Sequence, residues 1–79
     1  MTTEEKKATY EIIKKGTYAD YALINRHTSF QPYVLCWCFD ESDYTWAQGH
    51  YYDSYTEAMR AFLKNEKAVI EKLIDQWTN

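Results

Sequence analysis

Residues 53–77 have the sequence DSYTEAMRAFLKNEKAVIEKLIDQW, and this stretch decides the fold. Ser54 followed three residues later by Glu57 forms a capping box, which marks the beginning of a helix. The apolar residues that follow recur at helical spacing and form one broad stripe; they are Ala58, Met59, Phe62, Leu63, Val69, Ile70, Leu73, Ile74 and Trp77. Because no Gly or Pro interrupts the pattern, we predict one long helix over residues 55–77, whose apolar stripe needs a cover.

The segment before this helix is suited to supply that cover. Residues 17–52 are rich in Tyr, Trp, Phe, Val and Ile, which favour β-strands. A break that ends at Pro32 and a polar turn over residues 40–43 divide the segment into three runs. We therefore predict an antiparallel meander of three strands, at residues 19–26, 33–39 and 44–52.

The N-terminal segment has the signals of a second helix. Thr2 and Glu5 form another capping box, and Gly16 is of the kind that follows a helix C-terminus. We predict a helix over residues 3–15, with only a thin apolar stripe.

Length and composition bound the class of protein. With 79 residues, 46% of them apolar, and a formal charge of −3, the chain is expected to fold as one domain, residues 1–79. The predicted fold class is α+β, in the order αβββα, with the three-stranded sheet packed against the long C-terminal helix. No apolar run approaches the roughly 18 residues of a membrane span, and none follows the charged N-terminus as in an export signal. We expect a cytoplasmic protein that does not enter membranes.

The predicted strand at residues 33–39 is apolar on both faces, because bulky and slim apolar side chains alternate along it. One helix covers only one face of a three-stranded sheet, so the other face needs the N-terminal helix, a second subunit or a ligand. We predict a non-catalytic protein-interaction module, with self-association as a homodimer first. The candidate contact residues are Tyr33, Trp37, Phe39, Trp46 and Tyr51.

No arrangement of residues identifies an enzyme or a cofactor site. The sequence lacks a glycine-rich phosphate loop and a nucleophile elbow, so we expect no catalysis, no cofactor and no metal. Cys36, Cys38 and His50 include soft ligands for zinc, and a metal-binding or redox domain is therefore one alternative. The Cys-x-Cys spacing differs from that of a zinc knuckle, which favours free thiols.

Charge argues against nucleic-acid binding. Between residues 17 and 53, Arg26 is the one basic residue against five acidic residues. The helix-sheet-helix order resembles that of double-stranded-RNA-binding domains, and the step at residues 52–58, YDSYTEA, is similar to one in the DNA-binding arms of mobile-element integrases. Both families use basic surfaces that this chain lacks, so neither resemblance implies their function here.

A further alternative comes from the small size and the acidity of the chain. In these properties it resembles accessory proteins of bacterial phages and mobile elements, which implies a role in occupying and inhibiting a host protein. An acidic turn made of Asp40, Glu41 and Asp43 would then imitate nucleic-acid phosphates.

Overall fold

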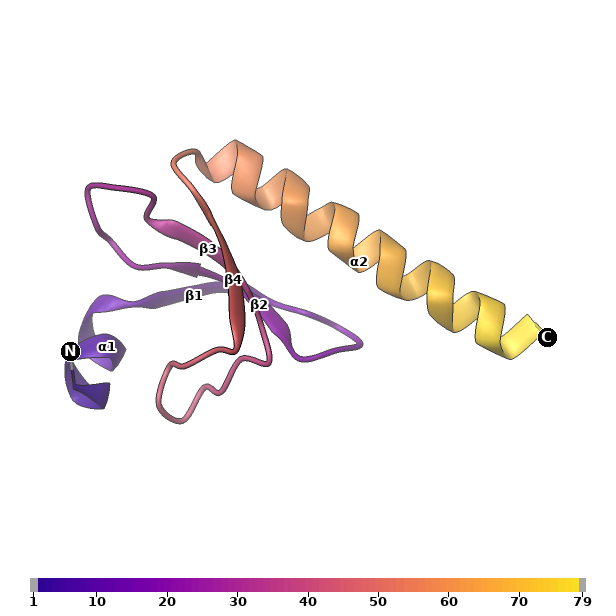
Figure 1. The fold of residues 1–79 in the computed structure, drawn as a ribbon, viewed down its shortest axis with the longest axis horizontal. Coiled ribbons are helices and arrows are strands. Elements are labelled where there is room, and N and C mark those ends of the chain that lie inside the picture. The colour runs from indigo at the N-terminus through magenta and orange to yellow at the C-terminus, as the bar shows by residue number, and fades with distance from the viewer. Residues whose placement is uncertain (1, 79) are drawn as a thin grey trace.

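A computed structural model describes residues 2–78 as an α+β domain with a four-stranded antiparallel sheet and two helices. The elements are α1 (Thr3–Thr9), β1 (Glu11–Lys15), β2 (Tyr21–Asn25), β3 (Tyr33–Trp37), β4 (Gln48–Tyr52) and α2 (Tyr55–Thr78). Their order in the sheet is β1-β2-β3-β4, so each strand pairs with its neighbours in the chain. The α2 helix crosses one face of this sheet and continues beyond it (Figure 1). Met1 and Asn79, which the predicted domain included, lie outside the described residues.

The predicted helix over residues 3–15 is wrong in its second half, and the predicted three-stranded sheet therefore gains a fourth strand. The N-terminal cap forms as predicted, because the backbone N–H of Glu5 donates to Thr2 Oγ1 at 3.2 Å. The α1 helix nevertheless ends at Thr9, and residues 11–15 pair with β2. β-branched Ile12 and Ile13 suit a strand, and pairing along β2 satisfies backbone groups that a short isolated helix would hold only weakly. Gly16 is not a helix cap, because it follows β1; it lies close to the Tyr21 ring, from which an added Cβ would be only 2.6 Å away.

The predicted positions of the other three strands are confirmed, but each is shorter than predicted. β2 covers residues 21–25 and β3 covers residues 33–37, rather than the predicted 19–26 and 33–39. β4 begins at Gln48 rather than at residue 44. Cys38 and Tyr44 have positive φ values of 56° and 54°, which extended strand residues do not adopt. The polar turn over residues 40–43 lies inside a longer loop, which an isolated bridge between Asp40 and Thr45 narrows.

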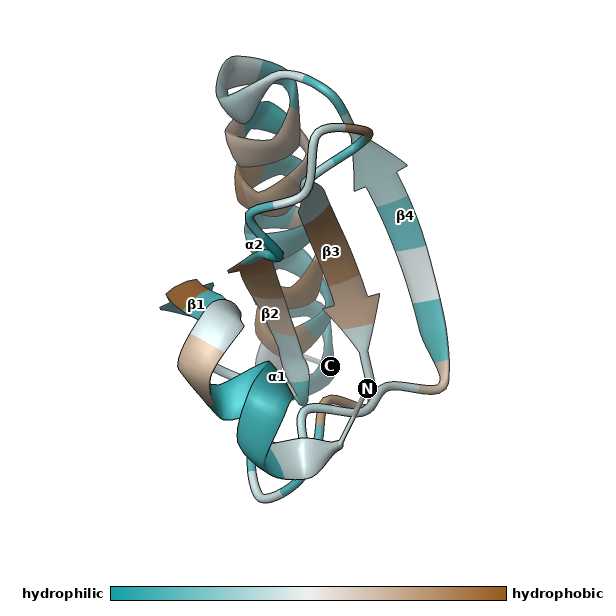
Figure 2. Ribbon diagram, turned by 90° about the vertical axis from the view of Figure 1, so that its left-hand side faces the viewer, coloured by the Kyte–Doolittle hydropathy of each residue, from teal (hydrophilic) through white to brown (hydrophobic). Residues whose placement is uncertain are grey.

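One face of the sheet packs against α2. Tyr21, Leu23 and Leu35 from the two central strands form a buried cluster with Ala58 and Phe62 of the helix. The central strands β2 and β3 are hydrophobic along most of their length, whereas the edge strand β4 is more hydrophilic (Figure 2). The sheet thus covers part of the apolar stripe of residues 55–77, as the sequence predicts.

The opposite face of the sheet is buried by the chain itself. Ala22, Ile24, Val34 and Cys36 have no exposed surface. The side chains packed against them come from the edge strand β1 and from the segments that flank the sheet, and they are Ile12, Tyr10, Phe39 and Trp46. Of the three covers expected from the sequence, the N-terminal helix, a second subunit or a ligand, residues of the N-terminal segment supply part, through Tyr10 and Ile12, and the loop after β3 supplies the rest. The physical reason is that four large side chains, three of them aromatic, span the narrow sheet, whereas α1 contributes no buried residue.

Candidate interaction surface

The contact between α2 and the sheet ends about halfway along the helix. A helix of 24 residues is about 36 Å long, whereas a five-residue strand spans about 17 Å. The buried residues of α2 are Ala58 and Phe62, both in its N-terminal half. The remaining length projects past the sheet, as Figure 1 shows, and contributes to a long dimension of 46 Å.

Glu66 marks the last polar attachment between α2 and the sheet. Its carboxylate accepts hydrogen bonds from the backbone N–H of Thr17 at 2.9 Å, from Thr17 Oγ1 at 3.0 Å, and from the hydroxyl of Tyr21. The hydrogen bond from Tyr21 and those from Thr17 lower the pKa of Glu66. Burial and the neighbouring carboxylate raise the pKa of Tyr21 well above its usual range. The loop between β1 and β2 is thereby held against the middle of the helix.

From Leu63 to the end of the helix, α2 presents apolar side chains that no other part of the described chain covers fully. Leu63, Ile70, Ile74 and Trp77 are 51%, 38%, 54% and 88% exposed. At 100° per residue these four side chains project from one side of the helix, next to the side that meets the sheet. We call these four residues the α2 stripe.

Tyr18 extends the α2 stripe on the side nearest the sheet. It lies in the β1–β2 loop, next to the attached Thr17, and is 59% exposed. A cavity of about 580 Å³, open to solvent, lies between its ring and the helix. The residues that line it are Tyr18, Ile70, Leu73, Ile74, Trp77 and Thr78.

The exposed area is comparable to the largest apolar patch of an ordinary monomer, and such patches are often functional. Tyr18 and Trp77 alone expose roughly 300 Å² of side chain, because one aromatic side chain buries 150–250 Å² when it is covered completely. Leu63, Ile70 and Ile74 add to the same area. A contiguous apolar patch of this size is typical of a protein interaction site.

The five contact residues predicted from the sequence do not lie on one surface. Tyr33 and Trp37 pack against the cluster beneath α2, and Phe39 and Trp46 pack on the opposite face of the sheet. Tyr51 is 40% exposed, and the Arg26 guanidinium lies 4.8 Å from the centre of its ring. The sequence analysis missed Tyr18 and treated the exposed residues of α2 as part of its sheet-facing stripe. The length of the predicted helix relative to its strands was the available signal that part of it would extend past the sheet.

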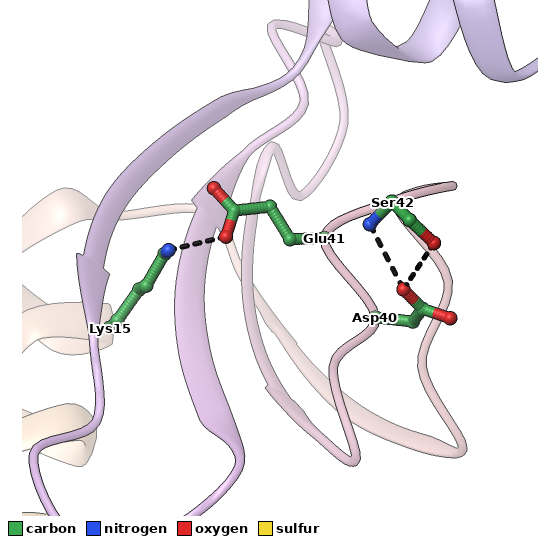
Figure 3. Close-up of polar contacts among 4 residues, drawn as sticks. All are labelled: Lys15, Asp40, Glu41 and Ser42. Carbon is green, nitrogen blue, oxygen red and sulfur yellow. Dashed lines mark hydrogen bonds and ion pairs between the residues drawn. The ribbon is translucent and has the colours of Figure 1, made fainter.

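The acidic turn uses its carboxylates within the chain. Glu41 forms an ion pair with Lys15 of β1, and the Asp40 carboxylate accepts hydrogen bonds from the backbone N–H and the hydroxyl of Ser42 at 2.9 and 2.6 Å (Figure 3). The hydrogen bonds from Ser42 lower the pKa of Asp40. Asp43 accepts a hydrogen bond from Thr45 Oγ1 at 2.6 Å. These bonds order the loop, and Lys15 offsets part of its negative charge.

The two thiols and His50 lie in different environments. Cys36 is buried and donates to the backbone carbonyl of Ala22 at 3.4 Å, whereas Cys38 is exposed beyond the end of β3. The ring of His50 packs edge-on against Trp37, at 5.2 Å between ring centres. Among residues 2–78, no three His, Cys, Asp or Glu side chains come together in a group that could hold a metal ion.

We expect the two thiols to differ strongly in reactivity. Burial raises the pKa of Cys36 to about 12, so its thiolate is scarce at pH 8. In an Ellman titration of the native protein, Cys38 should react rapidly and Cys36 only after a denaturant is added. The Cys38→Ser variant should show no rapid phase, and rapid reaction of both native thiols would contradict this assignment.

Comparisons with protein-family models, with curated proteins and with solved structures find no match to this chain. Within the described residues, neither helix is long and apolar enough to cross a membrane.

Proposed function

We propose that this chain is a non-catalytic protein-interaction module that self-associates through the α2 stripe and Tyr18. The observation that carries the proposal is the apolar side of α2 beyond Glu66, which leaves Trp77 and Ile74 mostly exposed. Moving such side chains out of water contributes about 25 cal/mol for each Å² of apolar area, and the surplus over the entropic cost of association appears as affinity. The self-association expected from the sequence is kept, but its surface moves from the sheet to the helix, because both faces of the sheet are packed within the chain.

The size of the patch suggests a moderate affinity. A standard stable interface buries about 800 Å² on each partner, and smaller interfaces are typical of weak or transient complexes. The apolar area exposed by the α2 stripe and Tyr18 approaches that of these smaller interfaces. We expect a dissociation constant in the micromolar region.

Sedimentation velocity tests the proposal directly. The protein should change from monomer to dimer as its concentration rises from about 1 to 100 μM. Ile74→Asp should raise the dimer dissociation constant at least about tenfold, because it places a charge in the apolar contact. Ala68→Asp is the matched control, since Ala68 is exposed on another side of the same helix and the introduced residue is identical. A monomer at all these concentrations, or an equal effect of the two variants, would contradict the proposal.

The two alternatives from the sequence receive less support. Inhibition of a host protein by phosphate mimicry would need free carboxylates at the acidic turn, but Asp40, Glu41 and Asp43 are all engaged within the chain. A metal or redox function would need Cys36 as a thiolate, and burial disfavours that form. We therefore retain self-association as the proposed function.

A further inference from the structure

We infer that the occupant of the α2 stripe is a second copy of this chain whose α2 runs antiparallel, with a two-fold axis that passes between residues 69 and 70. This inference rests on the proposed function and adds the orientation and register of the two helices. It is argued from the spacing of the stripe, from the charges beside it and from the charge of the whole helix.

The spacing of the stripe suits another copy of the same helix. Leu63, Ile70 and Trp77 are separated by seven residues each, which is the repeat of helices that pack along a common seam. With the axis between residues 69 and 70, Ile70 lies within one residue of the level of its own copy. Leu63 then lies level with residue 76 of the second copy, between its Ile74 and Trp77. The cavity beside Tyr18 is lined by those two residues and gives the incoming Leu63 side chain an apolar site.

The charges beside the stripe are complementary in the same register. Lys67 follows Leu63 by four residues and Glu71 precedes Ile74 by three, so both lie along the edge of the stripe that is distant from the sheet. Both are exposed, and within one chain the Lys67 ammonium lies 3.9 Å from the Glu71 carboxylate. A two-fold axis perpendicular to antiparallel helices brings equivalent edges together, which places Lys67 of each copy across from Glu71 of the other. Farther out, the same register places Lys64 level with Asp75.

A parallel arrangement lacks this complementarity. In a parallel pair the two-fold axis runs along the helices, so the edge that carries Lys67 and Glu71 lies on opposite sides of the seam in the two copies. Lys67 of one copy then cannot face Glu71 of the other, and the opposite charges that favour association and set the orientation are not paired. The antiparallel pair is therefore the arrangement that the charges select.

The charge of the whole helix favours this occupant over a membrane surface. Residues 55–78 contain four basic residues, Arg60, Lys64, Lys67 and Lys72, and four acidic residues, Glu57, Glu66, Glu71 and Asp75. Helices that bind anionic lipid carry a strong excess of positive charge on their polar side. The charges of α2 are balanced overall, and along one edge they are basic before Ile70 and mainly acidic after it. A helix with this pattern is instead complementary to a second copy that runs antiparallel to it.

Distance measurement between spin labels tests the orientation. A label at Thr56→Cys, in a Cys38→Ser background, lies in the first turn of α2 and outside the paired stretch of residues 63–77. In the antiparallel dimer the two labelled positions are about 40 Å apart along the helix axis, since each residue adds 1.5 Å. In a parallel dimer they are separated by little more than the roughly 10 Å between packed helices.

Charge exchange tests the register. Lys67→Glu should raise the dimer dissociation constant about fivefold, and the double variant Lys67→Glu with Glu71→Lys should return it to within about twofold of the unmodified value. Lys72→Glu is the matched control, because Lys72 is exposed on the side of α2 opposite the stripe and undergoes the same change. It should leave the dissociation constant within about twofold.

The outcomes separate this inference from the proposed function. A dimer with labels about 40 Å apart and rescue by the double variant would support both. A dimer with short label distances, or without rescue by the double variant, would overturn the antiparallel register and leave self-association standing. A monomer at all concentrations would overturn both.

Discussion

Replacing Phe62 with alanine is expected to lower the free energy of unfolding by about 3–5 kcal/mol. Phe62 has no exposed surface and joins α2 to the sheet, with its ring 5.5 Å from the ring of Tyr21 between centres. The substitution removes this contact and leaves a cavity between the two layers. A domain of this length has a total stability of only about 4–12 kcal/mol, so the loss is a large part of it.

Denaturant unfolding followed by circular dichroism measures this effect, at a protein concentration low enough to keep the chain monomeric. The matched control is Leu63→Ala, one residue further along α2, whose side chain is 51% exposed. It should cost less than about 1 kcal/mol in the monomer, because little packing is lost. If the two variants were equally stable, the placement of α2 on the sheet would be wrong.

Replacing Trp46 with alanine is expected to cost about 2–4 kcal/mol, the second-largest effect that we predict. The indole lies directly over Gly49, where an added Cβ would come within 3.0 Å of the indole nitrogen, and it packs beside Val34. Gly49 of β4 is paired with Cys36 of the adjacent strand β3, so removal of the indole opens the buried face next to that thiol. The variant should therefore also expose Cys36 to thiol reagents in the native protein.

Trp77→Ala provides the matched control for this prediction, because the same side chain is removed from a position that is 88% exposed. In the monomer it should change the free energy of unfolding by no more than about 0.5 kcal/mol and leave the reactivity of Cys36 unchanged. Equal stability of the two variants, or an unreactive Cys36 in Trp46→Ala, would contradict our conclusion that the chain itself buries the second face of the sheet.

The two helices show which features of the fold local sequence patterns predict and which depend on contacts between distant residues. The periodicity of residues 55–77 predicted α2 to within one residue at its C-terminus, because capping and apolar spacing act within a few residues. The same capping signal at Thr2 predicted the beginning of α1 but not its end. Ile12 pairs with Ile24, twelve residues away, and the energy of such a pairing is absent from any local pattern.

The candidate site was harder to predict than the fold. Trp37 and Trp46 are of a residue type that is common at interfaces, yet folding places them in two different clusters inside the chain. Trp77 and Ile74 have the spacing of core residues, yet the sheet ends before it reaches them. Composition identifies which side chains prefer to leave water, but it does not tell whether the chain or a partner will cover them.

Residue types and their spacing along the chain are enough to predict the α+β class, the long C-terminal helix and the apolar character of the central strands. Long-range packing is needed to explain why residues 11–15 join the sheet, why Tyr10 and Trp46 close its second face, and why α2 extends past its edge. The physical reason is that these outcomes depend on the relative sizes of elements far apart in sequence. A helix of 24 residues and strands of five residues cannot bury each other completely, and the part left over is the surface that we propose for association.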